Sequence, residues 1–154
     1  MKKINWGILG AARVNERLIP AIIKSKQGKL VAIASRRQNA AEECIKKYAP
    51  EYTQDIESHT GFDSILSNKE IDAIYIPLSN EEHTETALKA IRNKKHVLVE
   101  KPMAIKSKEV QLLIDKAKEN NVKIMEGFMY AFHPQFDRIQ NIIQSNILGE
   151  VNYA

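Results

Sequence analysis

Short runs of apolar residues alternate along the chain with segments in which apolar residues recur at helical spacing. The runs at residues 4–9 and 73–76 are largely apolar throughout, which is typical of parallel strands covered on both faces. Leu18 and Ile22, which follow the first run, fall on one side of a helix. The alternation continues along the chain and predicts an α/β fold with a doubly wound parallel sheet.

The boundaries of most elements follow from this pattern. Pro20 lies inside the first predicted helix, which must begin late or bend there, and Pro50 ends the second helix. The pattern beyond Pro50 is weaker and indicates a short strand near Tyr52. Ser79 and Glu82 have the spacing of a capping box. The predicted strands are 4–9, 29–35, 73–76, 96–99 and 122–125, and the predicted helices are 18–23, 41–48, 63–66, 84–91, 110–117 and 134–147.

Composition excludes several classes of protein. The chain has 154 residues, of which 44% are hydrophobic and 27% charged, as in an ordinary globular domain. Its net charge of +4 is spread along the chain, whereas a nucleic-acid partner usually requires a basic stripe. No run approaches the ~20 apolar residues of a membrane span. Cys44 is the single cysteine, so we expect a reducing, cytoplasmic location.

The first strand ends in a turn of small residues. A dinucleotide site needs such a turn, because the backbone must approach the pyrophosphate and the following helix must direct its N-terminus at it. The usual G-x-G-x-x-G pattern reads here Gly10-x-Ala12-x-x-Asn15, so a plain strand–helix turn of another α/β protein is an equal alternative. The turn residues expected to bind a coenzyme are Gly10, Ala12, Arg13 and Val14.

The second strand ends in Ser35-Arg36-Arg37. A protein that selects NAD usually places an acidic side chain there for the ribose 2′-hydroxyl. A hydroxyl and two guanidinium groups instead suit a 2′-phosphate, because arginine matches phosphate oxygens well. These three residues therefore favour NADP over NAD, the alternative being two solvated arginines at a strand end.

The most distinctive feature is Glu100-Lys101-Pro102, directly after the strand at 96–99. Ligands of open parallel sheets bind at the carboxyl ends of the strands, so this tripeptide points toward the crevice. Pro102 fixes the local backbone and allows a cis bond with Lys101. The four histidines are scattered without the spacing of metal ligands, so no metal site is expected: His59, His83, His96 and His133.

Several motifs occur in a specific order, although none is decisive alone. They are 6–13 (WGILGAAR), 62–66 (FDSIL), 71–80 (IDAIYIPLSN), His83, 96–102 (HVLVEKP) and 126–130 (EGFMY). In this order the sequence resembles the Gfo/Idh/MocA oxidoreductases, the family of glucose-fructose oxidoreductase and inositol dehydrogenase. The resemblance implies an NAD(P)-binding Rossmann domain at 1–125. Residues 126–154 would then be a connecting segment and helix that lead into a truncated α+β substrate domain.

The resemblance also implies roles for individual residues. Lys101 would lie beside the nicotinamide and the substrate hydroxyl as the catalytic residue, and Glu100 would hold the nicotinamide end. Tyr130 and His133 would face substrate or pack at a domain boundary. His83 is either a coenzyme-site residue or a surface histidine. The residues expected beside the pyrophosphate and nicotinamide ribose are Pro77, Leu78, Asn80 and His83.

The chain departs from the family pattern at three places. Asn15 replaces a small residue of the fingerprint, so the start of the first helix is expected to be looser. Ala131 stands where relatives often carry arginine, which weakens inference about substrate contacts there. The residues after Gly149 resemble the start of a strand, and the sequence stops there. We therefore expect a chain cut short, weakly active or inactive alone, and a homo-oligomer when full length.

Three functions are compatible with these observations. The favoured one is the nucleotide-binding half of an oxidoreductase that moves a hydride between NADP, or NAD, and a sugar, polyol or related alcohol. The second is a non-catalytic dinucleotide-binding module, either a redox sensor or a partner-dependent subunit. The third, a methyltransferase that uses S-adenosylmethionine, typically needs an acid where this chain has Ser35-Arg36-Arg37.

Overall fold

A computed structural model describes residues 3–150 of the chain. Its strands form one six-stranded sheet in the order β3-β2-β1-β4-β5-β6, and every pair is parallel. This is the strand order of a Rossmann sheet, which confirms the predicted fold class. The strands are β1 (Ile4–Leu9), β2 (Gly28–Ser35), β3 (Glu57–Thr60), β4 (Ala73–Ile76), β5 (His96–Val99) and β6 (Ile124–Glu126).

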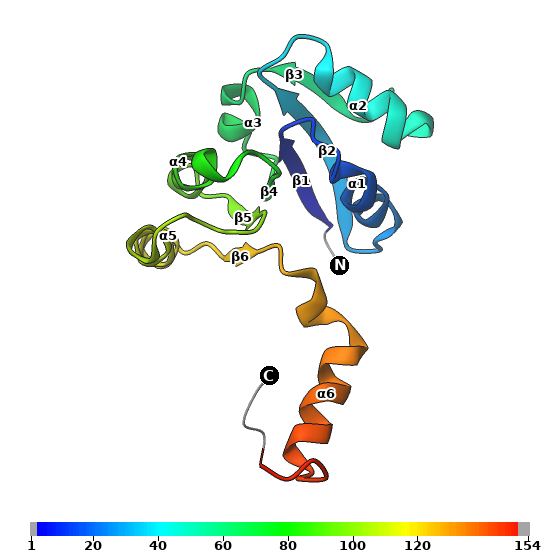
Figure 1. Cartoon of the computed structure of the whole chain (residues 1–154). Coiled ribbons are helices and arrows are strands. Elements are labelled where there is room, and N and C mark those ends of the chain that lie inside the picture. The colour runs from blue at the N-terminus through cyan, green and yellow to red at the C-terminus, as the bar shows by residue number, and fades with distance from the viewer. Residues whose placement is uncertain (1–2, 151–154) are drawn as a thin grey trace.

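Helices cover both faces of the sheet (Figure 1). In Figure 1, α1 and α2 lie on one side of the strands, while α3, α4 and α5 lie on the other. The helices are α1 (Asn15–Lys24), α2 (Ala40–Tyr48), α3 (Asp63–Ser67), α4 (Asn80–Arg92), α5 (Ser107–Glu119) and α6 (Pro134–Gln144), with 3-10 turns η1 (Pro50–Tyr52) and η2 (Met129–Phe132).

Neighbouring residues of one strand pack into opposite halves of the core. In β1, Ile8 joins the apolar cluster beneath α1 and α2, whereas Leu9 joins the cluster beneath α3, α4 and α5. In β4, Tyr75 belongs to the first cluster, and Ile74 and Ile76 belong to the second. Because both faces of each strand are buried, the strands need apolar residues at consecutive positions. This explains the continuous apolar runs in the sequence.

Two predicted strands were placed wrongly. The segment at Tyr52 is not a strand but the 3-10 turn η1, which Pro50 begins. The strand of this region is β3, whose sequence ESHT is polar and whose position is at the sheet edge. The strand predicted at 122–125 is β6 at Ile124–Glu126. It begins later because Val122 still belongs to the turn that ends α5, where its N–H donates to the Ala117 carbonyl.

Of the two alternatives expected for Pro20, a late helix start is excluded, because Pro20 lies inside α1 and α1 begins at Asn15. Two details at helix ends differ from prediction. The last helix ends at Gln144 rather than 147. Ser79 is the N-cap of α4 but makes no capping bond, since its hydroxyl donates instead to the Glu82 carboxylate.

The segment after β6 leaves the sheet domain, and α6 extends away from it (Figure 1). The main neighbour of α6 is η2, and both elements expose large apolar side chains, such as Phe132 of η2 and Ile143 of α6. Within residues 3–150, no helix is long and apolar enough to cross a membrane. The strand expected after Gly149 falls mainly on residues 151–154, outside the described residues.

Candidate functional site

The carboxyl ends of β1, β2 and β4 surround a groove of about 210 Å³. β1 pairs with β2 on one side and with β4 on the other, so the strand order reverses here, as at the ligand crevice of open α/β sheets. Seven of the residues predicted to bind a coenzyme line this one groove: Gly10, Ala12, Ser35, Arg36, Arg37, Pro77 and Leu78.

Gly10 lines the groove where the turn after β1 closely approaches the loop after β4. Its backbone has φ +134°, a conformation that favours glycine, and a Cβ atom there would lie 2.9 Å from Cδ2 of Leu78. Its N–H donates to the Ala34 carbonyl at 2.8 Å. The turn therefore needs glycine for both its conformation and its close approach to the loop after β4.

Asn15 closes the turn more tightly than expected. The side chain is fully buried, and its Nδ2 donates to the Gly10 carbonyl at 2.8 Å and contacts the Cys44 sulfur at 3.3 Å. Burial raises the pKa of the Cys44 thiol, which keeps it a neutral packing partner. The expectation of a looser helix start was therefore wrong, because the asparagine amide ties the helix to the turn.

The basic side of the groove is formed where β2 ends. Ser35 is buried, and its hydroxyl accepts the N–H of Arg37 at 3.3 Å. Arg36 crosses the groove, where its Nη1 lies 2.6 Å from Oε1 of Glu82 on α4. Arg13 and Arg37 also line an adjacent hollow of about 330 Å³ against α2. From the sequence, Glu82 was expected only as part of a helix cap, and its place in the groove was missed.

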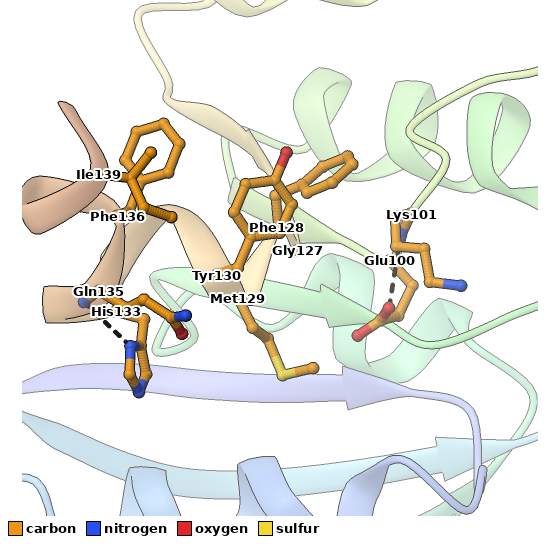
Figure 2. Close-up of a pocket in the computed structure, with 10 residues that line it drawn as sticks. All are labelled: Glu100, Lys101, Gly127, Phe128, Met129, Tyr130, His133, Gln135, Phe136 and Ile139. Carbon is orange, nitrogen blue, oxygen red and sulfur yellow. Dashed lines mark hydrogen bonds between the residues drawn. The ribbon is translucent and has the colours of Figure 1, made fainter. Parts of the chain in front are cut away.

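A second pocket of about 490 Å³ adjoins the end of β5. Figure 2 shows Glu100 and Lys101 on one side and the start of α6 on the other, with Phe128, Met129 and Tyr130 between them. The rings of Phe128 and Tyr130 pack edge to face, 5.0 Å apart between centroids. The structure therefore brings the predicted catalytic residue Lys101 together with the two predicted substrate residues, Tyr130 and His133.

Tyr75 fixes the Glu100 carboxylate from below the pocket. The Tyr75 ring is buried, and its hydroxyl donates to Glu100 Oε1 at 2.6 Å. Burial, together with this carboxylate, raises the pKa of Tyr75, so the hydroxyl stays protonated as a donor. Glu100 Oε2 accepts the Lys101 N–H at 3.3 Å, and the Lys101–Pro102 bond is cis. A tyrosine in an otherwise apolar strand was the signal that sequence reasoning did not use.

His83 connects the loops of the two cavities. It is fully buried and is not the surface histidine of the alternative interpretation. Its Nδ1 lies 2.7 Å from the Pro102 carbonyl and its Nε2 lies 3.0 Å from the Leu78 carbonyl. His83 and Asn80 line neither cavity. Val14 lines an adjoining hollow of about 250 Å³ that also includes Glu100.

Known proteins share this architecture. Residues 4–128 match the Gfo/Idh/MocA family, described as an oxidoreductase family with an NAD-binding Rossmann fold. An uncharacterized oxidoreductase of Rhizobium meliloti is 36% identical over 152 residues, which are 98% of this chain and 44% of that protein. A dTDP-3,4-didehydro-2,6-dideoxy-alpha-D-glucose 3-reductase of Actinomadura kijaniata is 30% identical over 149 residues, 96% of this chain and 43% of that protein.

Among solved structures, a 3-ketoreductase from Actinomadura kijaniata in complex with TDP-benzene and NADP superposes with a TM-score of 0.88 and 30% identity. The match covers 97% of this chain and 46% of that one. The chain thus spans less than half the length of the relatives that it matches. The family match, the strand order and the groove at the switch point agree, and the chain belongs to the Gfo/Idh/MocA family of oxidoreductases.

Proposed function

We propose that the chain is the nucleotide-binding part of an NADP-preferring oxidoreductase that acts on a sugar, a polyol or a related alcohol or carbonyl compound. The observation that carries the proposal is the groove in which the Gly10 turn meets Ser35, Arg36 and Arg37. Relatives support the substrate class, since they include a deoxysugar 3-reductase and an NADP-dependent D-xylose 1-dehydrogenase.

The residues of the groove fit NADP. The space beside Gly10 is one that a Cβ would fill, as expected where backbone must approach a pyrophosphate. α1 begins directly after the same turn, and the positive end of its helix dipole favours an anion there. Arg36 and Arg37 lie at the end of β2, where this fold binds the ribose 2′ position of a dinucleotide. One guanidinium group can donate to two phosphate oxygens at once.

The second pocket suits the reacting groups. Bound NADP supplies hydride transfer to or from its nicotinamide. Lys101 lies at the edge of an apolar pocket, where its amine would exchange a proton with the substrate oxygen. Tyr75 and Glu100 hold the loop that carries Lys101 in place. Tyr130 and His133 would contact substrate across the pocket.

The exposed apolar side chains of η2 and α6 favour a further domain that packs over this pocket. We therefore expect the 154-residue chain to bind NADP but to turn over poorly without a substrate domain. In its complete form the protein would be a cytoplasmic homo-oligomer.

Titration with coenzyme tests the proposal. The wild-type chain should bind NADP⁺ more tightly than NAD⁺ by calorimetry. Arg36→Ala should weaken NADP⁺ binding by about tenfold and change NAD⁺ binding by less than about twofold, because only NADP offers a phosphate to the guanidinium. Arg92→Ala, at the far end of α4, is the matched control. Equal affinity for both coenzymes, unaffected by Arg36→Ala, would contradict the proposal.

Lys101 distinguishes the enzyme from a non-catalytic redox sensor. In protein reconstituted with a substrate domain, Lys101→Ala should lower kcat by about 100-fold or more, because a positioned proton donor is lost. Coenzyme affinity should change by less than about threefold. Unchanged behaviour in both assays would support the sensor instead. Lys106→Ala, exposed at the N-terminus of α5, controls for loss of a nearby charge.

A further inference from the structure

A carboxylate lies inside the groove that the proposed function assigns to NADP. Glu82, in the first turn of α4, lines the groove directly opposite the end of β2. Its Oε1 is 2.6 Å from Nη1 of Arg36, so the ion pair crosses from one wall of the groove to the other. The arginine best placed for a 2′-phosphate therefore already has an anionic partner.

The carboxylate is held in this position. Glu82 Oε2 accepts a hydrogen bond from the Ser79 hydroxyl, so both oxygens are engaged. The Glu82 side chain is only 27% exposed, whereas Arg36 is 64% exposed. An acid in the first turn of a helix is also favoured by the helix dipole. The acidic partner is therefore more firmly fixed than the basic one.

We propose that Glu82 is a specificity-determining residue that weakens NADP binding relative to NAD binding, a proposal that rests on the dinucleotide site of the proposed function. A 2′-phosphate is close to doubly negative at neutral pH. To reach Arg36 it must compete with Glu82 for the guanidinium and approach a fixed negative charge. A ribose 2′-hydroxyl has no charge to repel, and a carboxylate can accept its hydrogen bond.

The consequence is a coenzyme preference set by two opposed side chains. Arg36 favours the phosphate of NADP, and Glu82 reduces that advantage and lets NAD compete. The sequence at the end of β2, read alone, therefore overstates the selectivity for NADP. The strength of the preference depends on an acid 46 positions further along the chain (82 − 36).

Calorimetric titration of the 154-residue chain with NADP⁺ and NAD⁺ tests the role of Glu82. Glu82→Gln keeps the shape of the side chain and removes its charge. It should lower the Kd for NADP⁺ by about tenfold, the size expected for one partly screened charge near a dianion. The Kd for NAD⁺ should change by less than about twofold. In the Arg36→Ala background the gain in NADP⁺ affinity should fall to about threefold, since only the repulsion remains to be relieved.

The neighbouring exposed residue Glu81 provides the matched control. Glu81→Gln makes the same charge change on the same helix outside the groove, and it should leave both affinities within about twofold. Glu82→Ala removes the charge without adding an amide, should shift the ratio of affinities similarly, and serves if the glutamine variant does not fold.

The proposal is overturned if Glu82→Gln leaves the NADP⁺/NAD⁺ affinity ratio unchanged, or if Glu81→Gln shifts that ratio equally. If the wild-type protein binds both coenzymes and Glu82→Gln has the same NADP⁺/NAD⁺ affinity ratio, only the proposed role of Glu82 is refuted. Wild-type protein that binds neither coenzyme would overturn the proposed function and this inference together.

Discussion

The pair of Tyr75 and Glu100 illustrates how single residues shape the loop that carries Lys101. Tyr75 is the large polar side chain of β4, and its hydroxyl donates to the carboxylate of Glu100, which follows the neighbouring strand β5. A buried hydroxyl that bonds a charged group contributes more than a neutral pair does. This hydrogen bond fixes the carboxylate in the loop after β5, which accounts for a polar side chain in an otherwise apolar strand.

Replacement of this hydroxyl should destabilise the protein in a pH-dependent way. Tyr75→Phe should lower the free energy of unfolding by about 1–2 kcal/mol near pH 8, through loss of a charge-assisted hydrogen bond. The pKa of Tyr75 is raised in the folded protein, so its contribution is complete below the ordinary tyrosine value of about 10. Above that pH the unfolded chain loses the proton first, and the contribution declines.

Urea unfolding at pH 8 and pH 11 measures this difference. The gap between wild type and Tyr75→Phe should be smaller at pH 11, whereas the exposed Tyr52→Phe should follow wild type at both pH values. A gap that stays constant or grows with pH would refute the assignment of the hydroxyl as the buried donor.

Individual site residues differed in how well the sequence revealed them. The positions of Gly10, Arg36 and Lys101 beside cavities were predictable because each follows the carboxyl end of a parallel strand, where ligands bind; their roles stay predictions. Tyr75 and Glu82 were not, because their roles depend on contacts with residues 25 and 46 positions away. Periodicity along one segment carries no information about such pairings.

At the level of elements, strands buried on both faces were found from sequence and the polar edge strand was not. β1, β2, β4 and β5 contribute apolar residues to the core clusters, and this burial is what the sequence pattern records. β3 pairs only with β2, and none of its residues is fully buried. Its polar sequence follows from that position, so apolar runs could not have identified it.

One junction between elements depends on a buried lysine. Lys95, just before β5, is buried, and its amine donates to the carbonyl groups of Asn68 and Ile71 beyond the end of α3. Burial lowers the pKa of this amine. The favourable position of a cation at a helix C-terminus partly offsets that cost. The amine thus joins α3 to the start of the strand pair β4 and β5.

Removal of the amine should loosen this junction. Lys95→Ala leaves two carbonyl groups without their donor and should lower the free energy of unfolding by about 2–3 kcal/mol. Lys69→Ala, at an exposed residue of the α3–β4 loop that Lys95 contacts, should change it by less than about 0.5 kcal/mol. Chemical denaturation measures both. A loss below about 1 kcal/mol for Lys95→Ala would mean that water replaces the amine at little cost.

For the whole molecule, the doubly wound parallel sheet was predictable from the alternation of strands and helices, and the strand order is that of the Rossmann domain which the family resemblance implied. Register and helix ends were less predictable, because they depend on closing turns such as the one at Val122. The division into a Rossmann domain at 1–125 and a connecting segment at 126–154 stays a prediction. Proteolysis that releases α6 and leaves the sheet intact would support it.

Most residues of the groove and the pocket lie in loops that follow strands, in η2 or at the start of α6, and none of them is a buried member of the two apolar clusters. The residues that line the cavities thus differ from the residues that form the core. With the proposed roles of Arg36 and Glu82, substitutions at these two positions would change which coenzyme is accepted while the core stays intact. Relatives with this arrangement would then need few substitutions to change from one nicotinamide coenzyme to the other.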